Sequence, residues 1–272
     1  MLRHIQRSPF ANVDPNLETT GYAQNILDWA SQTLSPDTCR RLMVQLNACL
    51  KWAIESSRVQ VARSPFDGLA AKAKKRIKRS SEETDINPFT KSERDAIIEN
   101  FRVNQNIHHY YYVTFCFYTG CRPSEAIGLT WNDVSWDLKK ITFREAVVAA
   151  AGGKKRCIGL KTQVRRVFPC NEQVQSLLAE IKENRSVDYG PVLTSTTGGE
   201  FSTSYFRKVW QRVLSNLRIE YRKPYQTRHT FITLYLEVGV DVKDLAKWVG
   251  NSPEVIYRHY AGKKMGLIPP RI

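Results

Sequence analysis

The spacing of hydrophobic residues predicts two helices in the first 70 residues. Residues 17–34 carry apolar side chains at helical intervals. The next stretch opens with Ser35 and Pro36, residue types that favour the N-cap and the first turn of a helix. Apolar residues then repeat every four positions, at Leu42, Leu46, Leu50 and Ile54. A stripe of this kind is typical of core packing, so we expect a small helical domain over residues 1–70.

A basic segment follows this first domain. Six of the nine residues from 71 to 79 are Lys or Arg, and the segment leads into the polar sequence SSEETD. Because the run has no apolar periodicity, we interpret residues 71–86 as a linker, either a solvated tail or a strand lying along a nucleic-acid backbone. The candidate nucleic-acid contacts in it are Lys72, Lys74, Lys75, Arg76, Lys78 and Arg79.

Helical patterns open the second region, residues 87–272. Thr90 is a candidate N-cap for a helix that contains Ile97 and Phe101. The following sequence HHYYYVTFCFYT is apolar nearly all round, which indicates a buried helix, and Gly120 can end it. Pro123 then lies in the first turn of a short helix.

Short β-rich pieces interrupt these helices. They cover residues 134–136, 141–143 and 165–168, and the basic sequence GGKKR forms a loop between them that offers Lys154 and Lys155 as further nucleic-acid contacts. Helical patterns resume after residue 171 and continue to residue 262. The predicted fold is therefore mainly α with a small antiparallel β-sheet.

Composition points to a polyanion as the partner. The chain of 272 residues has 41 Lys and Arg against 26 Asp and Glu, a net charge of +15. Neutralising phosphates releases counterions, so such an excess favours nucleic-acid binding. No run of 18 apolar residues and no secretory signal are evident, and we expect a cytoplasmic, nucleoid-associated protein. The six cysteines lack metal-ligand spacing and are expected to be reduced thiols.

Several familiar catalytic motifs are absent from the sequence. It contains no GxxxxGK[ST], GxGxxG or HExxH motif and no acidic cluster suited to magnesium. Arginines, lysines, amides and tyrosines remain. Paired guanidinium groups can stabilise the charge of a phosphoryl transition state, and a tyrosine can attack phosphorus covalently. We therefore expect phosphodiester chemistry without metal, cofactor or ATP.

Three segments carry a family resemblance. TGCRPSEAIGLTWNDV resembles the first arginine motif of the tyrosine recombinases, the phage integrase family. KTQVRRVFP resembles the hairpin with that family's catalytic lysine, and the segment from Tyr225 to Gly262 resembles its C-terminal block. The resemblance implies a catalytic domain over residues 87–272. Residues 1–70 resemble, more weakly, a shortened core-binding domain of the family, and we expect no separate arm-binding domain before it.

The resemblance assigns roles to individual residues. Arg122 and Arg228 are implied to grip the scissile phosphate, and Lys161 to protonate the 5′ oxygen. Glu125, three residues after Arg122, is implied to orient that arginine from behind the site. Tyr260, nine residues after Asn251, matches the nucleophile, and Tyr257 is left as a packing or phosphate-contact residue.

The chain departs from the family pattern at two catalytic positions. Tyr225 stands where the family usually has His, and Asn251 where it usually has His or Trp. Both side chains can donate a hydrogen bond, but an amide cannot transfer a proton and a phenol is a poor base near neutral pH. His229 is interpreted as a packing residue rather than a catalytic one.

Three functions stay open at this point. The first is an active site-specific recombinase that forms a 3′-phosphotyrosyl intermediate on double-stranded DNA attachment sites; the resemblance implies a homotetramer on paired sites and a directionality factor as a partner. The second is a catalytically impaired relative that binds recombination sites. The third is a type IB topoisomerase-like enzyme, which the short helical N-terminal domain disfavours.

Overall fold

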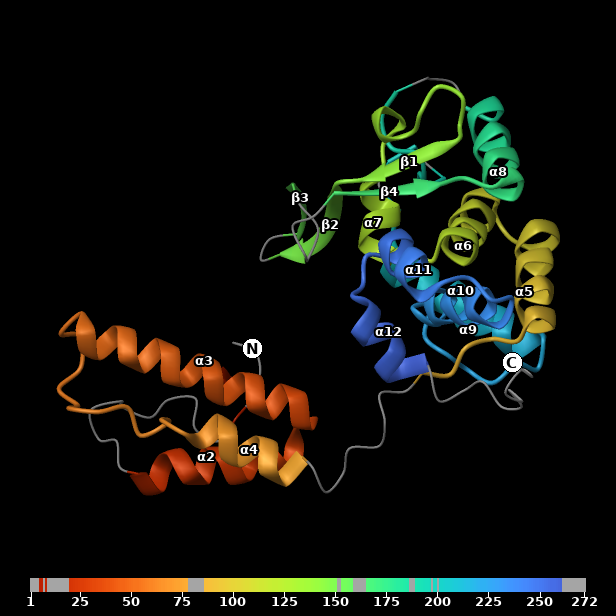
Figure 1. Cartoon of the computed structure of the whole chain (residues 1–272). Coiled ribbons are helices and arrows are strands. Elements are labelled where there is room, and N and C mark those ends of the chain that lie inside the picture. Colours follow the sequence, from red (N-terminus) through yellow and green to blue (C-terminus); the bar gives the residue numbers. More distant parts are fainter. Residues whose placement is uncertain are drawn as a thin grey trace, which may run out of the picture. The chain divides into compact units, whose positions relative to one another are not determined.

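The computed structural model describes residues 5–6, 8, 20–77, 86–150, 153–158, 165–185, 189–196, 198–199 and 201–260. The chain divides into two compact units, Met1–Thr84 and Asp85–Ile272. In agreement with the sequence-based expectation, the fold is mostly helical with short antiparallel strands (Figure 1). Within the described residues, no helix combines the length and the apolar character needed to cross a membrane.

The first unit is a bundle of three described helices, α2 (Thr20–Thr33), α3 (Pro36–Glu55) and α4 (Leu69–Ile77). Ser35 and Pro36 occupy the predicted N-cap and first-turn positions of α3, although the Ser35 hydroxyl bonds the Thr38 hydroxyl at 2.7 Å and no backbone group. Leu42 and Leu50 are buried, and Leu46 and Ile54 pack against the same core, which confirms the apolar stripe.

The expected start of the linker is wrong. Residues 71–77, interpreted as linker, continue the helix α4 that begins at Leu69. Ala73 is buried in the core of the first unit, on the same helix face as Leu69 four residues earlier. Because basic residues flank Ala73 in the sequence, this short apolar stripe was not recognised as a helix pattern. Lys78 and Arg79 lie outside the described residues, and the division between the units falls at Thr84.

The second unit packs helices around one buried helix. The helices are α5 (Lys91–Asn104), α6 (Ile107–Thr119), α7 (Pro123–Gly128), α8 (Glu172–Glu183), α9 (Thr203–Asn216), α10 (Gln226–Glu237), α11 (Val242–Val249) and α12 (Pro253–Tyr260), with a 3₁₀ turn, η2, at Trp131–Asp133. Ten of the 13 residues of α6 are buried, including the three consecutive tyrosines Tyr110–Tyr112. The all-round apolar pattern is therefore explained by contacts with α5, α8 and α10 on different faces.

The N-terminal end of α5 is held by sequence features that the pattern predicted. The Thr90 hydroxyl accepts a hydrogen bond from the Glu93 amide at 3.1 Å, and the Glu93 carboxylate accepts from the Thr90 amide at 2.8 Å, which is a capping box. The Phe89 amide also donates to the Thr230 hydroxyl of α10 at 2.9 Å. The start of the unit is thereby tied to the helix that carries Arg228.

The strands form two separate antiparallel pairs. β1 (Lys140–Phe143) pairs with β4 (Arg166–Pro169), and β2 (Glu145–Ala150) pairs with β3 (Gly153–Ile158). The basic sequence expected as a loop is thus largely strand β3: Lys154 pairs with Ala149 and Lys155 with Val148. The apolar run of β2, which is separated from β3 by only two residues, supplies the partner strand, and the basic composition of β3 does not reveal this local pairing.

Residues 134–136 do not form the expected strand. Val134 makes an isolated bridge to Ile141, and the chain then turns through Ser135–Leu138. The Asp137 carboxylate accepts hydrogen bonds from the Ser135 hydroxyl at 2.6 Å and the Lys139 amide at 3.1 Å, and Leu138 has a positive φ of 58°. Turn hydrogen bonds therefore replace strand pairing here, and Trp136 is exposed.

Gly120 ends α6 in the left-handed conformation, with φ 59°. A Cβ at this position would lie 2.5 Å from a ring carbon of Phe231 on α10. We predict that Gly120→Ala lowers the free energy of unfolding by about 3 kcal/mol, because it adds left-handed strain and a clash with a buried ring. Urea unfolding of the full chain measures this change.

Gly239→Ala is the matched control. Gly239 also has a positive φ, 87°, but nothing described lies within 4 Å of its added Cβ. The control isolates the backbone strain and is expected to cost about 1 kcal/mol. Equal losses in the two variants would show that the Phe231 contact imposes no constraint.

Candidate active site

Arg122 occupies the N-cap position of α7, at the point where the chain leaves the buried helix α6. Glu125, in the first turn of α7, accepts from the Arg122 backbone amide at 2.8 Å and from its guanidinium Nη1 at 2.7 Å. The other terminal nitrogen, Nη2, donates to the Gly250 carbonyl at 2.8 Å. Hydrogen bonds therefore hold both the backbone amide of Arg122 and its guanidinium group.

Arg228 is the second arginine that the sequence predicted for the site. It lies on α10 and is 1% exposed, and its Nη1 donates to the Gly120 carbonyl at 2.7 Å. Burial lowers the pKa of Arg228 to about 10, a value at which the guanidinium is still charged near neutral pH. A buried cation with one carbonyl partner from α6 is suited to an anionic ligand.

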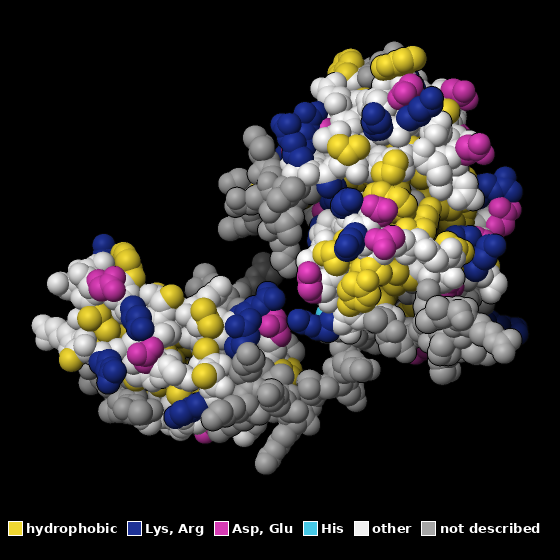
Figure 2. Space-filling view, in the orientation of Figure 1, with side chains coloured by type: hydrophobic (Ala, Val, Ile, Leu, Met, Phe, Trp, Pro, Cys, Tyr) yellow, Lys and Arg dark blue, Asp and Glu magenta, His cyan; other side chains and the backbone are white. Residues whose placement is uncertain are grey.

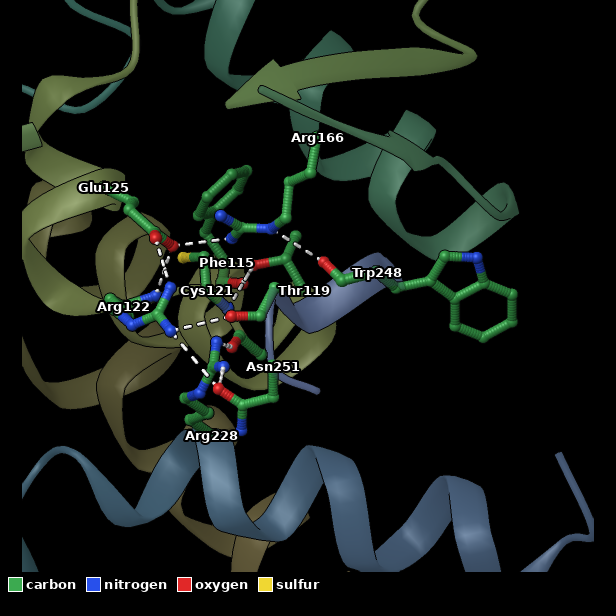
Figure 3. Close-up of polar contacts among 11 residues, drawn as sticks. Phe115, Thr119, Cys121, Arg122, Glu125, Arg166, Arg228, Trp248 and Asn251 are labelled. Carbon is green, nitrogen blue, oxygen red and sulfur yellow. Dashed lines mark hydrogen bonds and ion pairs between the residues drawn. The ribbon is translucent and has the colours of Figure 1, made fainter. Parts of the chain in front are cut away.

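Asn251 brings the two arginines to one point. Its Oδ1 accepts from Arg122 Nη2 at 3.2 Å and from Arg228 Nη2 at 3.0 Å (Figure 3). Asn251 follows Gly250, which ends α11 in the left-handed conformation with φ 67°. Two predicted arginines, from segments distant in sequence, thus converge on one oxygen atom of a third predicted site residue.

Arg166 is a site residue that the sequence analysis missed. It lies on β4, is buried, and donates from Nη2 to the Glu125 carboxylate at 2.6 Å and from Nε to the Trp248 carbonyl of α11 at 2.9 Å (Figure 3). Its guanidinium also stacks 4.2 Å from the centre of the Phe143 ring. The alternation of β4 was an available signal, since Arg166 shares a strand face with Phe168.

The charge of Glu125 depends on these two arginines. Burial alone raises the pKa of the Glu125 carboxyl, but hydrogen bonds and positive charge from Arg166 and Arg122 outweigh it and hold the pKa below its ordinary value. Because the pKa is lower in the folded state, the interaction stabilises the fold above the unfolded pKa and is lost as the pH falls through the folded value. Glu125 is thus a buried carboxylate shared by Arg122 and Arg166.

Tyr260 is the last residue of α12 and is buried, whereas Tyr257, one turn earlier, is exposed. The Tyr260 hydroxyl is hydrogen-bonded to Nδ1 of His229, the residue after Arg228. Burial raises the pKa of the Tyr260 phenol, and the positive charge of Arg228 opposes that rise. The sequence led to the interpretation of His229 as a packing residue, yet it contacts the predicted nucleophile. Its spacing of four residues from Tyr225 would place both side chains on one helix face, and this was an available signal that His229 lies near the site.

Tyr225 lies at the N-cap position of α10 and is 41% exposed. Its ring is in edge contact with His229, with 5.3 Å between ring centres. The Tyr225 side chain is thus partly exposed beside His229, whereas Arg228 is buried.

The predicted lysines are less fully described. Lys161 lies outside the described residues. Lys72 is exposed on α4. On the face in Figure 2, Lys and Arg side chains lie among Asp and Glu side chains. Only the backbone is described for Lys74, Lys75, Arg76, Lys154 and Lys155.

No group of three or more His, Cys, Asp or Glu side chains in the described ranges is arranged to hold a metal ion. The described site consists instead of three guanidiniums, one carboxylate, an amide, an imidazole and two phenols. This set can bind a phosphodiester and supply a nucleophile.

Comparison with known proteins assigns the chain to a family. The model of the Phage integrase family matches residues 87–265, which include every described residue of the site. The chain belongs to the phage integrase family.

Individual relatives are distant. A tyrosine recombinase XerC-like protein of Caldanaerobacter subterraneus subsp. tengcongensis is 25% identical over 158 residues, which are 50% of this chain and 40% of that relative. The chain spans about half the length of most curated relatives that it matches.

Solved structures share the fold. The Tn1549 transposon integrase in complex with transposon right end DNA superposes with a TM-score of 0.74 at 18% identity, covering 97% of this chain and 87% of that one. The lambda integrase tetramer bound to a Holliday junction gives a TM-score of 0.60 at 14% identity, covering 87% and 65%.

The ion pair between Arg166 and Glu125 should be important for stability. We predict that Arg166→Met lowers the free energy of unfolding by about 3 kcal/mol, because it removes one partner of a buried pair. Arg165→Met is the control, since Arg165 is the exposed neighbour, and we expect a change within about 0.5 kcal/mol. Urea titration of both variants tests this, and similar small losses would contradict a structural role for the buried pair.

Proposed function

We propose that this protein is a site-specific DNA recombinase that cuts and rejoins DNA through a 3′-phosphotyrosyl intermediate on Tyr260. The observation that carries the proposal is the convergence of Arg122 and Arg228 on a single oxygen, 3.2 and 3.0 Å away. Two guanidinium groups aimed at one oxygen match the geometry of a bound phosphate. Membership of the phage integrase family supports the same activity.

The scissile phosphate is proposed to take the place that the Asn251 amide oxygen occupies between the arginines. Asn251 then turns its amide N–H toward a phosphate oxygen. The two guanidiniums stabilise the negative charge that builds on the non-bridging oxygens in the transition state. Glu125 and Arg166 hold Arg122 in position without contacting the DNA.

The covalent step is a displacement at phosphorus. The Tyr260 hydroxyl oxygen forms a bond to phosphorus as the bond from phosphorus to the 5′ oxygen breaks. Lys161 is proposed to give a proton to the departing 5′ oxygen, on the strength of its match to the family's lysine. Attack by a 5′-hydroxyl on the phosphotyrosine reverses these bonds, and the phosphodiester energy is conserved.

The proposed partner is double-stranded DNA at an attachment site. The net charge of +15 favours phosphate contacts, and exposed Lys72 on α4 and the lysines of β3 are candidate contributors. A homotetramer on paired sites is proposed because lambda integrase, a neighbour in fold, forms a tetramer on a Holliday junction. A directionality factor remains part of the proposal by resemblance alone.

A second candidate is a DNA-binding relative without strand-cleaving activity. Tyr225 and Asn251 favour it, because neither side chain readily accepts a proton near neutral pH. The two candidates differ in one measurable product, the covalent protein–DNA adduct.

We predict that the protein forms this adduct and that Tyr260→Phe abolishes it. A duplex selected for binding from a random library by Tyr260→Phe protein supplies the site, and a nick near its cleavage position traps the intermediate on a denaturing gel. Tyr257→Phe is the matched control and should retain the adduct, since this ring is exposed. Binding without any adduct in the unmodified protein would favour the second candidate, and an adduct lost only in Tyr257→Phe would reassign the nucleophile.

Arg122→Ala should separate catalysis from binding. We predict a loss of adduct formation of about 100-fold or more, because one of two guanidiniums at the phosphate is removed. Duplex affinity should change little, since it is spread over many phosphate contacts. Gel-shift and adduct assays on the same substrate measure the two effects; a parallel fall in both would contradict this role.

A further inference from the structure

The hydrogen bond between Tyr260 and His229 links α12 to α10 beside the arginine pair. His229 Nδ1 faces the Tyr260 hydroxyl, and their ring centres lie 5.8 Å apart. His229 follows Arg228 directly, and its ring is also in edge contact with the Tyr225 ring, with 5.3 Å between the ring centres. An imidazole therefore touches the atom that is proposed to attack phosphorus.

The proposed reaction requires a proton acceptor at this atom. The Tyr260 phenol is buried, and burial raises its pKa, so the hydroxyl keeps its proton near neutral pH. The proton has to leave as the bond to phosphorus forms. The amide of Asn251 cannot accept it, and Tyr225 offers only a second phenol where the family usually has a histidine.

We propose that His229 is a further catalytic residue, whose Nδ1 takes the hydroxyl proton of Tyr260 as this tyrosine attacks the phosphate. The inference rests on the proposed function of the site. This role requires the neutral tautomer that carries its hydrogen on Nε2, in which Nδ1 accepts the hydrogen bond of the Tyr260 hydroxyl. In the reverse step the 5′-hydroxyl attacks phosphorus and gives its proton back to Lys161, while the bond to Tyr260 breaks and His229 returns the proton to the phenol oxygen.

The surrounding charges suit this transfer. Arg228 and Tyr225, from α10 and its N-cap, act on Tyr260 electrostatically, and Arg122, Glu125 and Arg166 act on Arg228. The positive charges of these arginines stabilise the negative charge that develops on the phenol oxygen, and they disfavour a further positive charge on the imidazole. The bound phosphate supplies a negative charge that offsets this repulsion when the imidazolium forms.

The test measures single-turnover adduct formation by the full chain from pH 5 to pH 9 on the nicked, selected duplex. His229→Asn places an amide oxygen where Nδ1 was but accepts no proton. We expect the rate of adduct formation to fall by about 100-fold or more. We also expect the pH–rate profile to lose the acid limb that an imidazole base produces between about pH 5 and 8. His259→Asn, the same change one residue from the nucleophile, should keep the wild-type rate and acid limb.

Two further measurements separate proton transfer from folding or positioning. Added imidazole should restore part of the rate of His229→Ala, in proportion to its neutral fraction. A substrate with sulfur in place of the 5′ bridging oxygen releases a thiolate that needs no proton, so it should rescue Lys161→Ala but leave His229→Asn slow.

Several results would overturn the assignment. These are a wild-type rate and pH profile in His229→Asn, an acid limb that disappears in His259→Asn instead, or rescue of His229→Asn by the sulfur substrate. A lowered melting temperature of the His229 variants without any imidazole rescue would make the residue structural. Absence of adduct in the wild-type protein would reject the proposed function itself, and the assignment with it.

Discussion

The buried carboxylate of Glu125 is the interaction on which the described site depends. It accepts hydrogen bonds from Arg122 at 2.7 Å and Arg166 at 2.6 Å, and thereby joins α7 to β4. Arg166 continues to the Trp248 carbonyl of α11, while Arg122 reaches the Gly250 carbonyl beyond the same helix. One anion between two cations thus fixes the positions of three segments. Without it, the guanidiniums would repel one another in a region of low dielectric.

The balance of charge at this point suits an anionic ligand. The described side chains that meet there include three guanidiniums and one carboxylate, so positive charge is in excess. Arg228 in particular is buried with carbonyl and amide oxygens as its partners. A phosphodiester between Arg122 and Arg228 would supply the compensating charge. The same excess helps to explain why the pKa of Arg228 is low for an arginine.

Helix α10 connects this charge cluster to the hydrophobic core. Its Thr230 accepts from the Phe89 amide, its Phe231 packs against Gly120, and its Arg228 donates to the Gly120 carbonyl. The end of α6 therefore meets both the packing face and the polar face of α10. A small shift in this contact would move Arg228 relative to Arg122, so core packing and site geometry are coupled. Tyr260 completes the arrangement from α12 through its bond to His229.

Local sequence chemistry determined most of the helices and their caps. The capping box at Thr90, the leucine stripe of α3 and the Gly120 end of α6 follow from interactions within a few residues, which a sequence pattern records directly. Arg122, Arg228, Asn251 and Tyr260 were proposed as site residues because their segments resemble motifs of the phage integrase family, although Asn251 stands where that family usually has His or Trp. In the structure, Arg122 and Arg228 both donate hydrogen bonds to the side-chain oxygen of Asn251.

Only the tertiary structure decided the long-range pairings. Burial of Ala73 in the core of the first unit accompanies the extension of α4 into the expected linker. The burial of Arg166 against Glu125, 41 residues away, and the contact of His229 with Tyr260, 31 residues away, depend on how separate elements pack. Local periodicity marks which face of an element is apolar. It does not say which polar group on another element meets that face, and this is why the two residues that complete the site emerged from the fold.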